Sequence, residues 1–196
     1  RADLSADINN PTGRGDQLKL RANRTEHDLS TFASIGYNFP VGNDGWRLAA
    51  NYSDVRYQLA GDFVALGIEG GARTADVALS WPMTRTRGVN ETLAFSARRT
   101  QLSQKVLGTS SPTVSVPMLS TAYVASWIGS DAAVTTLLLQ ASSNGRRNTN
   151  GTSTDAVRLR LELDATYLLP LDRYWDVYLR GAGSYSPERL PDSEKY

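Results

Sequence analysis

The clearest strand pattern in the sequence lies at residues 155–170, which read DAVRLRLELDATYLLP. Apolar side chains at positions 157, 159, 161, 163, 165 and 167 alternate there with charged or polar ones. Because a strand sends successive side chains to opposite faces, the segment has one apolar and one strongly charged face, and no helical period fits it. In a soluble sandwich the apolar row points into a core. In an outer-membrane barrel it points into lipid, and the charges line a wet lumen. The alternation alone allows both.

The composition narrows the classes of function. The 196 residues carry 21 Lys and Arg against 20 Asp and Glu, which gives no electrostatic reason to expect a nucleic-acid partner. The absence of cysteine excludes disulfide frameworks, thiolate metal sites and cysteine nucleophiles. The sequence has no run of about 18 apolar residues and therefore predicts no transmembrane helix. Gly, Ser, Thr, Asn, Tyr and Trp are plentiful, and Pro occurs mostly in predicted turns, which is typical of an all-β chain.

Alternating and β-rich segments predict about ten strands, and no helix of useful length competes with them. The predicted strands are Ala2–Ile8, Gln17–Arg24, Thr31–Phe39, Trp46–Gln58, Ala72–Trp81, Glu91–Ser103, Leu119–Ile128, Val134–Ser143, Ala156–Leu169 and Asp176–Ser186.

The predicted connections alternate in length. Short turns at 9–16, 40–45, 82–90, 129–133 and 170–175 alternate with longer polar segments at 25–30, 59–71, 104–118 and 144–155. An up-and-down membrane barrel, with short periplasmic turns and long outer loops, produces this order. A Greek-key sandwich has no reason to keep it. Several predicted strands also exceed the 9–11 residues that cross a bilayer.

Aromatic residues give a second indication, because all four tryptophans lie within a few residues of a short connection. Aromatic rings with a polar atom favour the boundary between lipid and water. The sequence thus predicts an aromatic girdle formed by Trp46, Trp81, Trp127, Trp175, Tyr37 and Tyr167.

Charged residues that alternate with apolar ones are the candidates for a lumen wall. Mixed signs on one side of a strand would keep water inside a pore, and a mid-membrane Arg turned towards lipid would cost about 2–4 kcal/mol. A contact with an unfolded substrate or a plug element is the sharper alternative. The candidate lumen-lining residues are Arg158, Arg160, Glu162, Asp164, Lys19, Arg21, Arg47 and Arg98.

Three hairpins carry a family resemblance. Tyr37–Phe63, YNFPVGNDGWRLAANYSDVRYQLAGDF, resembles the barrel of two-partner-secretion transporters, the haemolysin secretion/activation proteins of the Omp85 superfamily. Leu79–Asn90 (LSWPMTRTRGVN) and Asn9–Leu18 (NNPTGRGDQL) are similar to further hairpins of that family. The ending Ser186–Tyr196 (SPERLPDSEKY) is similar to its L-x-x-S-E-x-F/Y stretch.

The resemblance implies an antiparallel up-and-down transmembrane β-barrel of 16 strands in the Gram-negative outer membrane. Residues 1–196 would be part of one barrel domain, with the periplasmic domains and closing strands not included. The implied activity is secretion of an unfolded exoprotein of the haemolysin or adhesin type. The implied partners are that exoprotein and outer-membrane lipid, with no nucleic acid, small-molecule substrate, cofactor, metal or catalytic residue.

Two alternatives stay open. A barrel-assembly insertase of the same superfamily would share these hairpins, and a soluble β-sheet binding module would share the alternation. Enzyme chemistry has little support, since the single histidine, His27, lies in a predicted loop and Gly-x-Ser-x-Gly is absent.

Overall fold

A computed structural model describes residues 1–25, 29–59, 67–147 and 153–187. His27 and most of the Ser186–Tyr196 segment lie outside these ranges. No helix among the described residues is long and apolar enough to cross a membrane. The strands are β1 (Ala2–Asn9), β2 (Gln17–Arg24), β3 (Ser30–Val41), β4 (Trp46–Gln58), β5 (Glu69–Arg85), β6 (Val89–Val106), β7 (Thr109–Ser110), β8 (Val114–Ile128), β9 (Val134–Arg147), β10 (Ser153–Pro170) and β11 (Asp176–Tyr185).

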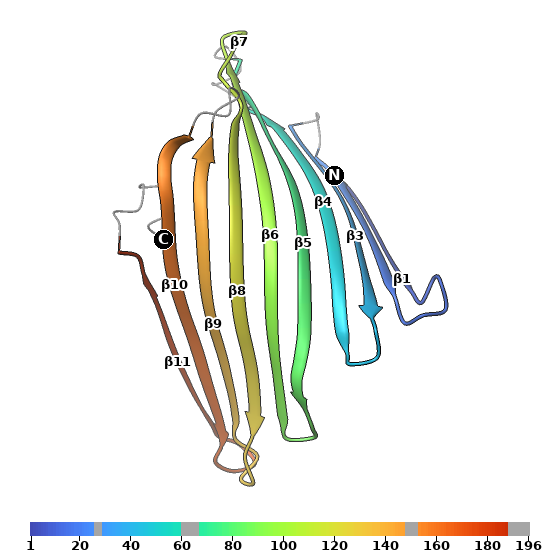
Figure 1. The fold of residues 1–196 in the computed structure, drawn as a ribbon, viewed down its shortest axis with the longest axis vertical. Coiled ribbons are helices and arrows are strands. Elements are labelled where there is room, and N and C mark those ends of the chain that lie inside the picture. Colours follow the sequence, from blue (N-terminus) through green and yellow to red (C-terminus); the bar gives the residue numbers. More distant parts are fainter. Residues whose placement is uncertain (26–28, 60–66, 148–152, 188–196) are drawn as a thin grey trace. The chain divides into compact units, whose positions relative to one another are not determined.

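The strands form one antiparallel sheet in chain order, from β1 through β6 and then β8 to β11, while β7 pairs only with β6 (Figure 1). This confirms the predicted all-β, up-and-down architecture. Among the described residues, β1 and β11 each have one strand neighbour, so the sheet is not closed.

One predicted loop is wrong in detail. The sequence predicts a long irregular connection at 104–118, but β6 continues to Val106 and turns tightly into β7. Leu107 (φ 50°) and Gly108 (φ 76°) form this turn, and Lys105 pairs with Ser110 across it. A two-residue turn with both φ values positive suits the twist of a hairpin. Such a turn is usually recognised in a sequence by Asn-Gly or Asp-Gly. Leu-Gly is not one of these pairs, so the turn was not predicted.

The predicted turn at 82–90 is shorter than expected. Strand β5 runs past Pro82 to Arg85, and the Thr86 amide donates to the Val89 carbonyl at 2.8 Å. Proline lacks one donor, but its carbonyl can still accept a hydrogen bond, so a single proline near a strand end need not end it.

The chain divides into two compact units. Unit 1 comprises Arg1–Ala78, Ala97–Met118 and Gly145–Ala156, and unit 2 comprises Leu79–Ser96, Leu119–Asn144 and Val157–Tyr196. Among the described residues, Ala125 and Ala133 are the buried hydrophobic side chains, and no large side chain is fully buried. The sheet therefore lacks the hydrophobic core that a soluble sandwich needs.

The short β1–β2 connection is organised around a buried carboxylate. Asp16 is 3% exposed, accepts from the Thr12 amide at 3.2 Å and accepts from the Tyr37 hydroxyl. Burial of the Asp16 carboxyl would raise its pKa, but these hydrogen bonds more than offset burial and hold the pKa below its usual value.

Candidate functional site

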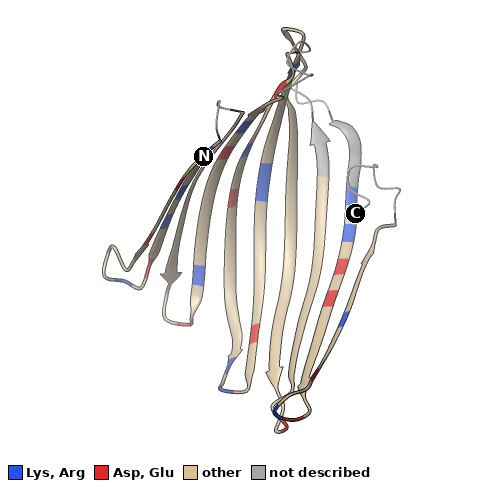
Figure 2. Cartoon of the chain, turned by 180° about the vertical axis from the view of Figure 1, so that it is seen from behind, with Lys and Arg blue, Asp and Glu red and all other residues tan. Residues whose placement is uncertain are grey.

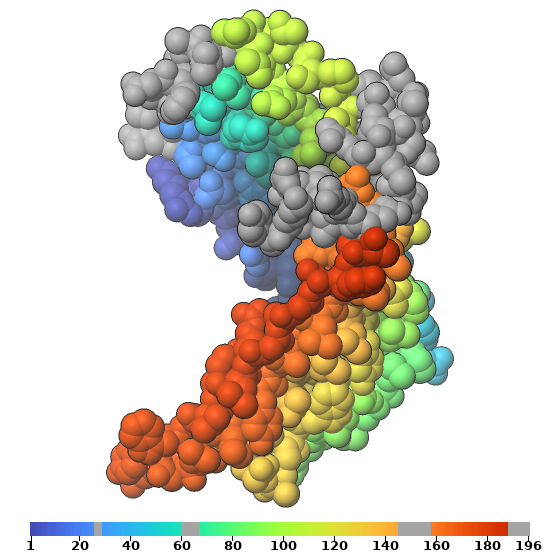
Figure 3. Space-filling model, turned by 90° about the vertical axis from the view of Figure 1, so that its left-hand side faces the viewer, coloured from blue at the N-terminus to red at the C-terminus, as the bar shows by residue number. Residues whose placement is uncertain are grey.

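The part of β10 that belongs to unit 2 keeps the predicted alternation. Leu159, Leu161 and Leu163 lie on one face and are 46%, 44% and 46% exposed. A shallow groove of about 630 Å³ lies on this face, lined by Leu161, Leu163 and Tyr185 among others. On the side seen in Figure 3, the side chains of β10 and β11 lie at the surface. These leucines do not pack against a second layer formed by the described residues.

The opposite face of β10 carries a row of ion pairs. Arg160 Nη2 lies 2.7 Å from Glu162 Oε1, and Arg180 of β11 contacts both oxygens of Asp164, at 2.6 and 3.1 Å. Arg158 also has an interaction partner. Figure 2 shows these charges following one another along β10. The structure thus brings the four predicted charges of β10 into one row.

The other four lumen candidates belong to unit 1. Arg47 donates to the Asn38 side chain at 3.0 Å and to the Gly15 carbonyl at 3.1 Å. By alternation, Lys19 and Arg21 lie opposite the apolar residues of β2, and Arg98 lies opposite Phe95 and Ala97 of β6. By alternation, every candidate lies on the polar side of its own strand, and the lumen-lining role of all eight remains a prediction.

Further polar contacts on this face were not predicted. Asn51 donates to Asp76 at 3.0 Å and lies over Gly36, where a Cβ would overlap the Asn51 side chain. In unit 2, Glu91 accepts from the Thr84 hydroxyl at 2.6 Å and from the Tyr123 hydroxyl at 3.0 Å. These pairs depend on which residues face each other across strands, and no local sequence signal carries that information.

The predicted aromatic girdle residues lie towards the short connections, as their place in the chain requires. Trp46 begins β4, and Trp175 lies in the β10–β11 turn with 70% of its surface exposed. Trp127 differs, because it contacts the Glu91 carboxylate, on the face opposite the exposed Val124 and Ile128. Its ring lies on the polar face of β8.

Trp81 follows the outward alternation of Val77 and Met83, and Tyr37 stacks at a tilt on Phe39, with ring centroids 5.5 Å apart. Tyr167 pairs with the exposed Leu179 of β11. The position of all six predicted girdle residues relative to lipid remains a prediction.

A single open sheet with one apolar and one charged face has a counterpart among known proteins. The model of the family "Haemolysin secretion/activation protein ShlB/FhaC/HecB" matches residues 1–196. The chain belongs to this family. Its members are outer-membrane β-barrel transporters of two-partner secretion. No curated protein matches the chain.

Two solved structures share the fold. CdiB from Escherichia coli matches with a TM-score of 0.77 at 16% identity, over 96% of this chain and 37% of that one. CdiB from Acinetobacter baumannii matches with a TM-score of 0.67 at 16% identity, over 96% of this chain and 36% of that one. The chain thus spans little more than a third of the CdiB chains that it resembles.

The family match confirms the resemblance seen in the hairpins. The family is a transporter family. Among the described residues, no group of three or more acidic or histidine side chains is arranged to hold a metal ion.

Proposed function

We propose that the chain forms part of one outer-membrane barrel domain that passes an unfolded partner exoprotein, of the haemolysin or adhesin type, to the cell surface. Lipid of the outer membrane would surround the apolar face, and the exoprotein would pass along the polar face. Transport on such a surface uses no nucleotide, nucleic acid, small-molecule substrate or cofactor. The family match favours secretion over barrel assembly.

The observation that carries this proposal is the separation of side chains on β10. Leu159, Leu161 and Leu163 are exposed on one face, and the ion pairs of Arg160 and Asp164 lie on the other. In water, a sheet with such an apolar face would need a second layer. In a bilayer, lipid chains supply that layer, and the charged face meets a wet lumen.

The polar face offers what an extended chain requires. An unfolded substrate exposes backbone donors and acceptors along its whole length. The Arg160 side chain is 28% exposed and pairs with Glu162 through Nη2, and its guanidinium carries five donor hydrogens, so its exposed part can also donate to a passing carbonyl. The carboxylates of Glu162 and Asp164 can accept from backbone amides. Because these positive and negative side chains are already paired with one another, their contacts with the substrate would be weak and would not trap it.

The side of the sheet that meets the exoprotein can be tested by cross-linking. The full-length protein that contains this chain would carry one cysteine, Glu162→Cys or Leu161→Cys, and its exoprotein would be stalled during secretion with a single cysteine in the segment inside the barrel. We expect a disulfide with Glu162→Cys, since that side chain faces the lumen. Leu161→Cys is the matched control, one residue away on the opposite face.

Equal cross-linking at both positions would contradict the proposed orientation. Cross-linking at neither position, with secretion intact, would show that the exoprotein does not travel along β10.

A further inference from the structure

The apolar face of unit 1 changes character along the strands. Cross-strand partners lie on the same face of a sheet. One row across β1 to β4 is therefore Ala6, Leu20, Ile35 and Tyr52. Two residues further along, towards the β2–β3 and β4–β5 connections, the row is Leu4, Ala22, Ala33 and Asp54. The next is Ala2, Arg24, Thr31 and Arg56.

Charged residues continue this border onto β5 and β6. Arg73 Nε donates to Asp54 Oδ2 at 2.9 Å, and residues 71 and 69 follow on the same face by alternation. Lys105 Nζ lies 3.7 Å from Glu69 Oε2. Asp54, Arg56, Glu69, Arg73 and Lys105 are called the rim cluster below.

Asp54 holds the two arginines of the rim cluster in place. Its carboxylate accepts from Arg56 Nε at 3.0 Å and from Arg73 Nε at 2.9 Å, and it is only 22% exposed. Arg56 and Arg73 are 67% and 57% exposed. Arg56 also contacts Asp54 through Nη2 at 3.5 Å, but a guanidinium has five donor hydrogens, so each arginine keeps donors on its terminal amino groups for a second acceptor. Both arginines are oriented and still accessible to an anion.

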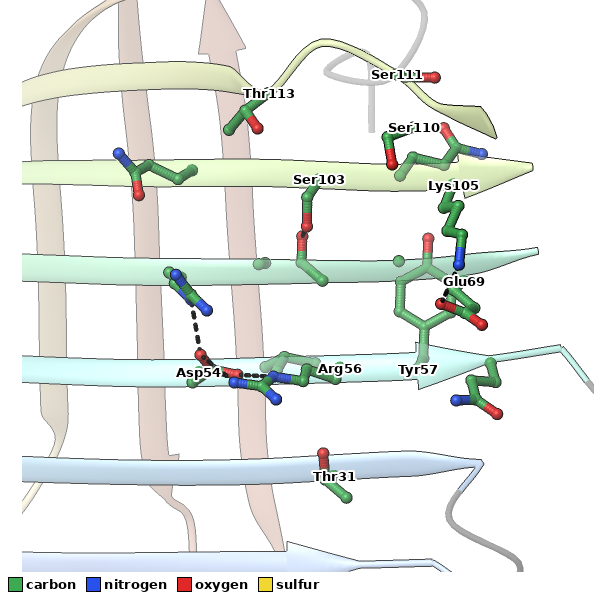
Figure 4. Close-up of a pocket in the computed structure, with 18 of the residues that line it drawn as sticks. Thr31, Asp54, Arg56, Tyr57, Glu69, Ser103, Lys105, Ser110, Ser111 and Thr113 are labelled. Atoms are coloured by element: carbon green, nitrogen blue, oxygen red, sulfur yellow. Dashed lines mark hydrogen bonds and ion pairs between the residues drawn. The ribbon is translucent and has the colours of Figure 1, made fainter. Parts of the chain in front are cut away.

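The rim cluster lines a groove of about 920 Å³, drawn in Figure 4, where Lys105 lies beside Glu69 and Arg56 beside Asp54. Among the described residues, four cationic side chains, including Arg24, and two carboxylates line it. Its remaining lining includes Ser103, Ser110 and Thr113, whose hydroxyls can bond to sugar or phosphate oxygens. The groove therefore has an excess of positive charge and many hydrogen-bonding groups.

We propose that the rim cluster binds the phosphate groups of a phosphorylated glycolipid in the membrane leaflet next to the β4–β5 connection. This inference rests on the proposed membrane orientation of the apolar face. Arginine forks bind phosphate with paired, charge-assisted hydrogen bonds. Asp54 is a positioning residue, because it acts on the lipid only through Arg56 and Arg73.

The neighbouring apolar row favours a lipid over a free anion or an acidic protein. Asp54 lies two residues beyond Tyr52 on the same face, which is about 7 Å along a strand. In a lipid, the acyl chains and the phosphate are separated by a similar distance, so one molecule can contact both the apolar row and the rim cluster. A free phosphate would gain nothing from the row that contains Leu20, Ile35 and Tyr52.

The test uses the full-length protein in bilayer discs that contain a diphosphorylated glucosamine-based lipid, or the same lipid without phosphates. Native mass spectrometry measures how much of each lipid the extracted protein retains. We expect the Arg56→Gln/Arg73→Gln variant to retain the phosphorylated lipid about tenfold more weakly, a difference of about 1.4 kcal/mol. Arg14→Gln, in the β1–β2 turn, is the matched control and should behave like the parent protein.

Removal of the phosphates should bring the parent protein down to the level of the double variant. Equal retention of the phosphorylated lipid by parent and double variant would overturn the proposal. Displacement of the lipid by millimolar inorganic phosphate would reassign the groove to a free anion and overturn it as well.

Arg73→Lys covers the case of a double variant that does not fold, because it keeps the charge without the fork and should bind with intermediate strength. Parent-like retention by Arg73→Lys would overturn the role given to the fork. Failure of the parent protein to insert into the discs would contradict the proposed function instead.

Discussion

The β10 row and the rim cluster contain the same kinds of residue on opposite faces of their strands. Arg158, Arg160, Glu162 and Asp164 lie in the middle of β10, which runs from Ser153 to Pro170. The rim cluster lies where β4 and β6 end and β5 begins. On the polar face, charge therefore occurs at mid-strand. On the apolar face of β4, charge begins beyond Tyr52, at Asp54.

The difference shows that the face of the strand decides how deep a charge can lie. A charge turned towards acyl chains costs about 2–4 kcal/mol at the midplane and about 0–1 near the interface. A charge turned towards a water-filled lumen avoids this cost at any depth. In the proposed membrane orientation, the ion pairs of β10 would therefore face a wet lumen, whereas those of the rim cluster would lie in the head-group region.

The largest effect is expected from a charge placed at mid-strand on the apolar face. Leu161→Arg should lower the free energy of unfolding in phospholipid vesicles by about 2–4 kcal/mol, because the guanidinium would face acyl chains. Urea titration of the full-length protein in vesicles measures this. The control is Ser184→Arg, which places the same side chain opposite Glu162 on the polar face. An equal decrease in the free energy of unfolding in the two variants would contradict the proposed difference between the faces.

A smaller effect is expected close to the rim cluster. Ala75 lies between Arg73 and Val77 on the apolar face of β5. Ala75→Arg should cost no more than about 1 kcal/mol in the same titration, since the interface tolerates charge. Val77→Arg, one step deeper, should cost more. Equal costs at positions 75 and 77 would place the lipid boundary elsewhere.

The smallest effect is expected for Asp16, whose carboxylate lies in the β1–β2 turn rather than on a face of the sheet. Because hydrogen bonds hold the pKa of Asp16 below its usual value, its contribution to stability is present above that usual value and is lost as the pH falls through the lowered pKa. The difference in unfolding free energy between the parent protein and Asp16→Asn should therefore shrink in acid. A difference that is constant from neutral pH to acid would contradict this role of the carboxylate.

Much of the fold was predictable because alternation is a local property. The bounds of β2 and β4 match their predictions, Gln17–Arg24 and Trp46–Gln58. The turn at Leu107 and Gly108 was not predicted, because its positive φ values occur there without the usual Asn-Gly pair. It also ended β5 at Trp81, because Pro82 looked like the end of a strand.

For the candidate site, the sequence predicted only which face of its strand each residue occupies. Alternation put Arg160 and Asp164 on one side of β10, but their partners depend on position and register. Asp164 pairs with Arg180 of β11, and Asp54 pairs with Arg73 of β5 across the β4–β5 connection. No pattern within a single strand specifies such pairs. The same limit applies to the contact between Trp127 and Glu91, which joins two strands.

The orientation of β10 is tested most directly by the accessibility of neighbouring positions in a bilayer. The 196 residues contain no cysteine, so single cysteines at Leu159, Arg160, Leu161 and Glu162 can be labelled without background from this part of the protein. With the full-length protein in vesicles, we predict that a water-soluble maleimide modifies positions 160 and 162 and spares 159 and 161. A lipid-borne quencher should dim a fluorophore at 159 or 161 only. Modification of all four positions at one rate, or the reverse pattern, would contradict the assignment of the leucines to lipid and the charges to the lumen.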